Sequence, residues 1–68
     1  MNMFIVRKNK VYESEMGRKV RVRDVKEDKR NPKFSQITLV DVDNRNRSVK
    51  GSERTIYQDS VRRRYVEA

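Results

Sequence analysis

The feature that most constrains the fold is a strict alternation of basic and apolar residues between positions 19 and 23. The basic residues are Lys19, Arg21 and Arg23, and the apolar residues between them are Val20 and Val22. Successive side chains of a β-strand point to opposite faces, so this pattern predicts a half-buried strand with three cations on one face. Gly17 precedes the alternation, where a turn with positive φ favours glycine. We therefore expect residues 18–26 to form the central strand of the fold.

The apolar residues of the chain are those that sheets prefer. There are ten valines, against the single leucine Leu39 and the single alanine Ala68. β-Branched residues lose rotamer freedom in helices and pack well on a pleated surface. The 68 residues are also too few for more than one domain. We therefore predict one all-β domain, residues 1–68.

Several further elements are expected along the chain. Residues 1–10 hold either a short strand at 3–6 or a loosely held arm, and residues 26–33 form a polar loop. Residues 34–43 form the second long strand. Because Val40 and Val42 would share one face of it, and Ile37 and Leu39 the other, it is either a central strand or a strand with a bulge.

The C-terminal third is expected to hold three short strands and one helical turn. The strands are residues 47–50, centred on Val49, then Arg54–Tyr57, then Tyr65–Glu67. The helical or 3₁₀ turn covers residues 58–63, with Asp59 or Ser60 as its N-cap. Five or six short strands at this spacing predict a small barrel.

The charge of the chain suggests a polyanionic partner. Eighteen Lys and Arg residues against ten Asp and Glu give a net charge of +8, and eleven of the cations are arginine. Nucleic acid is the first candidate, with an acidic protein or a membrane surface behind it. Arginine favours bidentate phosphate contacts. The alternative is that these charges only keep the surface solvated.

Several classes of function are disfavoured by composition. Cysteine and histidine are absent, which removes disulfides, thiolate or imidazole metal ligands and the usual nucleophile–base pairs. No signal peptide or apolar stretch of about 18 residues is present, so a cytoplasmic location without membrane insertion is expected. Asp41 and Asp43 begin a calcium-like motif, but Arg45 occupies a ligand position, so we expect a hairpin turn there. We therefore expect no enzyme activity, cofactor or metal.

The candidate nucleic-acid-binding residues are basic and aromatic. They are Lys19, Arg21, Arg23, Arg45, Arg47, Arg62, Arg63, Arg64 and Tyr57. Alternate residues of one strand lie about 6.5–7 Å apart, close to the phosphate repeat of a nucleic-acid backbone. The hypothesis is that these cations converge on one surface. The alternative is that they are scattered and solvated, or paired with Glu13, Glu15, Asp24 or Glu27.

The five aromatic residues divide between core and surface. They are Phe4, Tyr12, Phe34, Tyr57 and Tyr65. A core with so little leucine needs aromatic side chains, so at least three of the five are expected to be buried. Tyr57 lies opposite Ile56 in its strand and is expected to be exposed, where it could stack on bases.

From about residue 11 to residue 67 the chain resembles the small Src-homology-3-like barrels of bacteriophages and prophages. Less closely, it is similar to the KOW modules of transcription and ribosomal proteins. The resemblance is carried by Gly17-Arg18-Lys19-Val20-Arg21-Val22, the strand at 37–42, Arg54-Thr55-Ile56, the turn with Val61, and Arg64-Tyr65-Val66. The loop at 26–33 lacks the glycine of KOW modules, and the chain has no Trp for a proline-rich peptide groove. The resemblance implies a five-stranded barrel with a helical turn before the last strand, binding nucleic acid or a protein.

The sequence as a whole predicts a small basic protein, of phage or prophage type, that binds the phosphate backbone of DNA or RNA. Little sequence specificity is expected, because no recognition helix and no obvious Asn or Gln set is available to bind base edges. One alternative is an interaction module that binds and modulates an acidic host or phage protein, for example by strand addition. Another is a homodimer formed through the apolar residues 3–6.

Overall fold

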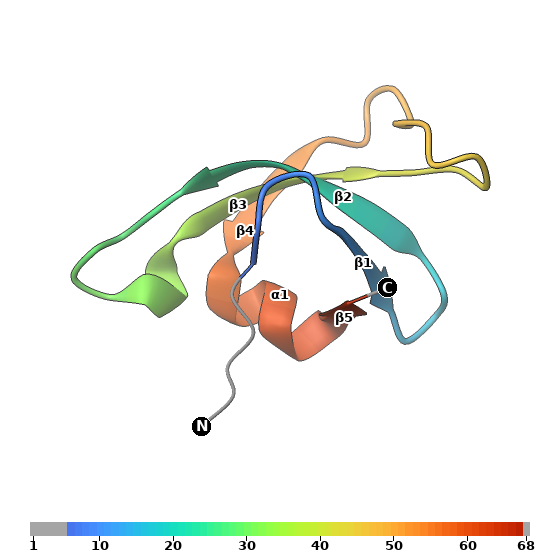
Figure 1. Ribbon diagram of the computed structural model, residues 1–68. Helices are drawn as coiled ribbons and strands as arrows, with labels where there is room; N and C mark the ends of the chain where they lie inside the picture. The colour runs from blue at the N-terminus through green and yellow to red at the C-terminus, as the bar shows by residue number, and fades with distance from the viewer. Residues whose placement is uncertain (1–5, 68) are drawn as a thin grey trace.

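The structure is a computed structural model that describes residues 6–67, and within them it shows five strands and one short α-helix (Figure 1). The elements are β1 (Val11–Ser14), β2 (Lys19–Lys26), the 3₁₀ turn η1 (Pro32–Phe34), β3 (Gln36–Asp41), β4 (Arg54–Tyr57), α1 (Gln58–Arg64) and β5 (Tyr65–Glu67). The all-β class and the helix before the last strand are confirmed.

All five strands belong to one antiparallel sheet with the order β4-β3-β2-β1-β5. β1 to β4 pair in chain order, and β5 returns to lie beside β1. Within residues 6–67 no backbone pairing joins the edge strands β4 and β5, so the sheet is open and the predicted barrel is not closed. The gap between the edges is bridged by a side chain, because Arg54 Nη2 donates a hydrogen bond of 3.1 Å to the Tyr65 hydroxyl.

The core lies between the sheet and α1, on what we call the inner face of the sheet (Figure 1). Its buried residues are Val6, Tyr12, Val20, Val22, Ile37, Leu39 and Val61. Val20 and Val22 are 0% exposed, as their alternation with the cations predicts. Val6 belongs to the core of its own chain, so it is not free for the dimer contact expected at residues 3–6; residues 3–5 lie outside the described range.

A bulge in β2 keeps its apolar residues on the inner face. Val22 pairs with Leu39 and Asp24 with Thr38, so Arg23 is an extra residue in β2. This shift lets Val25 face inward opposite Ile37, three residues after Val22. β3 lies between β4 and β2, so the segment predicted at 34–43 is a central strand, which was one of the two alternatives for it.

The outer face of the sheet is partly covered by the loop at residues 42–53. Val40 lies on this face opposite Arg21, yet it is only 3% exposed. The guanidinium of Arg21 donates a hydrogen bond to the backbone carbonyl of Asn46, which ties the loop to β2. The strand predicted at 47–50 is absent apart from a single bridge between Val42 and Ser48.

Side chains of the loop explain why that strand does not form. Asp43 Oδ1 accepts the backbone N–H groups of Arg45 and Arg47, and the Ser52 hydroxyl accepts that of Asp41. These bonds offer the backbone an alternative to a β-ladder.

The helix begins at residue 58 and extends one residue beyond the predicted segment 58–63, but it is not capped by Asp59 or Ser60. Its N-cap position is Tyr57, with no side-chain cap, and its first residue is Gln58. Asp59 lies in the first turn and forms an ion pair with Arg63 one turn later, at 2.5 Å. Gln58 anchors the helix start, because its backbone N–H donates to Ser35 O at 2.8 Å and its side chain to Pro32 O at 3.2 Å. β4 therefore runs directly into α1.

The core predicts a large cost for Leu39→Ala. Leu39 is 0% exposed, and such substitutions lower the free energy of unfolding by about 2–5 kcal/mol. That is a large share of the roughly 3–10 kcal/mol expected for a domain of this size. Urea denaturation followed by circular dichroism measures the change. Val66→Ala is the control, since Val66 is 66% exposed and its truncation should cost about 0.5 kcal/mol or less. Equal costs at the two positions would contradict this core.

Candidate nucleic-acid interface

Five of the predicted cations come together on β2 and the loop that covers the outer face. We call this set the outer strip; it consists of Lys19, Arg21, Arg23, Arg45 and Arg47. Lys19 and Arg45 are exposed and have no carboxylate partner among residues 6–67. Arg21 is half-buried and holds the loop through Asn46. Arg21 therefore joins the loop that carries Arg45 and Arg47 to β2.

The other two members of the strip form exposed ion pairs. Arg23 lies at the bulge, and its Nη1 lies 3.1 Å from Glu53 Oε2. Arg47 Nε lies 3.3 Å from Asp43 Oδ2. Neither carboxylate is among those that the sequence suggested as partners. Because exposed ion pairs contribute only about 0–1 kcal/mol, both arginines can exchange their carboxylate for another anion at small cost.

Asp43 organises the turn that presents Arg45 and Arg47. Its Oδ1 accepts the backbone N–H groups of both arginines at 2.9 Å, and Asn46 completes the turn with a φ of 61°. The hydrogen bond from the Arg47 N–H is the main cause that lowers the pKa of Asp43 below its ordinary value. The turn predicted in place of a calcium loop is confirmed. Within residues 6–67 no group of three or more acidic side chains is arranged to hold a metal ion.

The three arginines of α1 do not join the outer strip. α1 packs on the inner face through Val61, so Arg62, Arg63 and Arg64 lie on the other side of the sheet. The expected convergence of all the cations on one surface is therefore wrong. Their position at the C-terminal end of α1 also complements the helix dipole.

Arg63 and Arg64 instead line a hollow of about 410 Å³ together with Arg18 and Arg54, which sequence reasoning missed. Arg18 directly precedes Lys19, so the alternation of a strand places it on the face opposite to Lys19. This alternation is the sequence signal from which the position of Arg18 could have been predicted. The guanidinium of Arg54 already has two partners within the chain, because its Nη1 lies 3.1 Å from Asp41 Oδ1 and its Nη2 donates a hydrogen bond to the Tyr65 hydroxyl. The hydrogen bond to Tyr65 is the first cause that raises the pKa of Arg54 above its ordinary value.

Two of the aromatic side chains in residues 6–67 are exposed, and neither belongs to the outer strip. Tyr57 is 50% exposed, as predicted, and Phe34 is 47% exposed. Their rings meet edge to face, with centroids 5.7 Å apart. Among the four aromatics in residues 6–67, Tyr12 is fully buried and Tyr65 is half-buried against the core. The fifth, Phe4, lies outside the described residues, so the expectation of at least three buried aromatics stays a prediction. Phe34 lies outside the core, as the last residue of the 3₁₀ turn Pro32–Phe34, which contains no buried residue.

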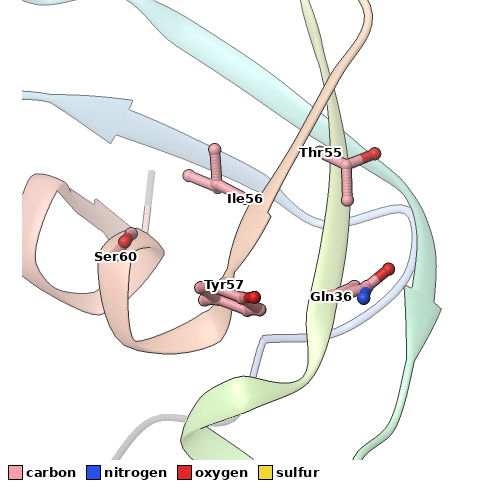
Figure 2. Close-up of a pocket in the computed structure, with 5 residues that line it drawn as sticks. All are labelled: Gln36, Thr55, Ile56, Tyr57 and Ser60. Atoms are coloured by element: carbon pink, nitrogen blue, oxygen red, sulfur yellow. The ribbon is translucent and has the colours of Figure 1, made fainter.

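A second hollow of about 410 Å³ lies beside Tyr57, on the edge strand β4. Figure 2 shows that its walls come from β3, β4 and α1. The lining residues are Gln36, Thr55, Ile56, Tyr57 and Ser60. In this view Thr55 and Gln36 project to one side of the strands and Ile56 to the other, and Tyr57 lies at the end of β4.

Most of the cations form no ion pair within the described part of the chain, whose sequence carries a net charge of +8. Four of the 18 Lys and Arg side chains form ion pairs among residues 6–67, which leaves fourteen without a carboxylate partner. The four carboxylates in these pairs belong to Asp41, Asp43, Glu53 and Asp59. The free charge is therefore available to an external anion.

Comparison with known proteins adds no relative: no family model, curated protein or solved structure matches this chain. The resemblance to Src-homology-3-like barrels thus stays a prediction, alongside the confirmed all-β class. Within residues 6–67, no helix has the length and apolar character needed to cross a membrane.

The geometry of the turn predicts an acid titration at Asp43. A carboxyl whose pKa is lowered in the folded protein favours the folded turn above its unfolded pKa, and this contribution is lost as the pH falls through the folded pKa. We expect the backbone amide signals of Arg45 and Arg47 to move together in an NMR titration, with a midpoint below the ordinary pKa of aspartate. Asp43→Asn keeps an acceptor oxygen but should abolish this titration. A midpoint at or above the ordinary value would contradict the role of Asp43.

Proposed function

We propose that this protein binds nucleic acid through the phosphate backbone, with little dependence on base sequence. The observation that supports the proposal is the outer strip, in which three cations of β2 are joined to the loop of Arg45 and Arg47 by the contacts of Arg21 with Asn46 and of Arg23 with Glu53. Lys19 and Arg21 are alternate residues of β2, so they lie about 6.5–7 Å apart, which suits consecutive phosphates.

The energetics of the strip favour phosphate as the external anion. Lys19 and Arg45 have no carboxylate to release, and the ion pairs of Arg23 and Arg47 are exposed. Charge-assisted hydrogen bonds from a guanidinium to a phosphate are stronger than neutral ones and can be bidentate. The release of condensed counterions adds a further gain that a single carboxylate partner does not provide.

The short helix supports the expectation of low sequence specificity. α1 has seven residues, and two of them, Gln58 and Val61, are buried against the rest of the fold. A helix held in this way is not free to enter the major groove, where base pairs present their full hydrogen-bonding code.

Salt dependence tests the proposal. In fluorescence anisotropy with random-sequence oligonucleotides, a strip that contacts several phosphates should give a log–log slope of about −3 to −5 in salt concentration. Lys19→Gln combined with Arg45→Gln should weaken binding and make the slope less negative by about 1.4–1.8, since each contact contributes about 0.7–0.9.

The matched control removes two charges from the other face. Arg63→Gln combined with Arg64→Gln changes the net charge by the same amount. Both residues line the hollow that also contains Arg18 and Arg54, and neither belongs to the strip. A smaller loss in this control supports the strip as the binding surface. An equal loss would assign binding to net charge alone, and no binding at 50 mM salt would refute the proposal.

Strand addition by a protein partner is the second candidate function. β4 is an edge strand, so within residues 6–67 one row of its backbone N–H and C=O groups has no strand partner. An extended peptide could pair with this row and fill the hollow of Figure 2.

Hydrogen exchange separates this candidate from nucleic-acid binding. A partner that adds a strand should slow the exchange of the outward-facing β4 amides, because they become hydrogen-bonded. A nucleic acid on the outer strip should leave these amides unchanged. An acidic extended peptide that protects no β4 amide would count against strand addition.

A further inference from the structure

One row of side chains crosses three neighbouring strands at the end of the outer face away from the strip. Tyr57 of β4 pairs with Gln36 of β3, and Gln36 pairs with Lys26 of β2. All three residues are exposed. Neighbouring strands lie about 4.8 Å apart, so Tyr57 and Lys26 flank Gln36 within about 10 Å of each other. We call these three residues the platform row.

Phe34 extends the row into a larger aromatic surface. Its ring packs edge to face with Tyr57, and both rings keep about half of their surface exposed, 47% and 50%. A hollow of about 340 Å³ on the β2 side is lined by Phe34, Gln36 and Lys26, and the hollow of Figure 2 lies on the β4 side. Gln36 belongs to both hollows. The aromatic pair is therefore a ridge between two concave surfaces.

Cations without ion pairs surround this ridge. Within residues 6–67 no carboxylate pairs with Lys26, Lys29, Arg30 or Lys33. Two carboxylates, Glu27 and Asp28, line the same hollow as Lys26, Lys29 and Arg30. Asp28 is directed to the backbone, because its Oδ1 accepts the N–H groups of Arg30 and Asn31. Exposed aromatic rings bordered by free cations suit a ligand that has both flat apolar faces and negative charges.

We propose that the platform row and Phe34 bind the unpaired bases of a single-stranded nucleic acid. A base stacks on Tyr57 or Phe34, the amide of Gln36 hydrogen-bonds to its edge, and Lys26 contacts the adjoining phosphate. Every base offers a flat face, so stacking tolerates any sequence. In a duplex these faces are covered by neighbouring base pairs, so the platform selects single strands. The inference rests on the proposed function and names the strand type that the outer face prefers.

The platform and the strip can serve the same strand. Gln36 and Val40 lie on the same face of β3, and the four residue steps from one to the other span about 13 Å. Val40 is paired with Arg21 of the strip. A single strand can therefore follow the outer face from the strip cations to the aromatic ridge, and on the way it passes Thr38 and the exposed Asp24 paired with it. A second copy of this chain is disfavoured as the occupant, because it would bring a like net charge of +8 onto the same cations.

The test compares one oligonucleotide in single-stranded and duplex form. The chain has no Trp, so Tyr57→Trp supplies a unique fluorophore whose emission should be quenched when a base stacks on it. For the otherwise unaltered protein, Tyr57→Ala should weaken single-strand binding roughly 5- to 150-fold, the range measured for loss of one stacked base. Duplex binding should change less than twofold, because it uses the strip.

Two controls distinguish stacking from general loss of surface. Tyr57→Phe keeps the ring and should bind single strands nearly as well as the parent. Met16→Ala removes an 86% exposed apolar side chain elsewhere and should change neither affinity. Circular dichroism confirms that each variant is folded.

The outcomes separate this inference from the proposed function. Equal binding of single strands and duplexes, with no effect of Tyr57→Ala and no quenching at Trp in Tyr57→Trp, overturns the platform and leaves backbone binding intact. Absence of binding to either form overturns both. Single-strand preference that is lost in Tyr57→Ala and kept in Tyr57→Phe supports the platform.

Discussion

The pairing of β2 with β3, offset by one residue at Arg23, is the constraint on which the rest of the structure depends. Without the extra residue, Val25 would follow the parity of Arg21 and face outward, and Lys26 would face the core. With it, Val25 reaches the inner face opposite Ile37, and Lys26 takes its place beside Gln36 on the outer face. One inserted residue thus improves the core and sets the charge pattern of the surface.

The inner face leaves few apolar groups for any other purpose. Its core cluster has seven buried residues, and a short helix contributes Val61 to close it. The open side of the sheet, between β4 and β5, is bridged by the hydrogen bond from Arg54 to Tyr65, which stands where a closed barrel would have backbone pairs. Apart from Val40, which the loop covers, the described strands present mainly polar and charged side chains on the outer face, together with the exposed ring of Tyr57.

Local patterns in the sequence predicted the parts of the fold that depend on local physics. The alternation at Val20 and Val22 gave a half-buried strand, and the parity of Tyr57 placed its ring outside. Contacts between residues far apart in the chain could not be predicted from such local patterns. The bulge at Arg23 is a property of register with β3, and the gathering of Arg18 with Arg64 depends on how α1 docks on the sheet.

Side-chain bonds to the backbone account for the remaining differences. The segment 47–50 has the composition of a strand, but Asp43 and Ser52 bind the backbone groups on which a strand would depend. The same bonds hold Arg45 and Arg47 in an exposed turn. The side-chain bonds that prevent the predicted strand therefore position two of the five cations of the outer strip.

In the proposed binding mode, the two parts of the outer face contribute different physical terms. Cations attract any phosphate backbone over about the Debye length of 8 Å, so the strip supplies affinity and fast encounter without selecting a ligand. Stacking acts only at contact and only on uncovered bases, so the exposed rings of Phe34 and Tyr57 supply selection. Since β3 joins both parts within one rigid sheet, a single strand can satisfy the two terms together, whereas a duplex satisfies only the first.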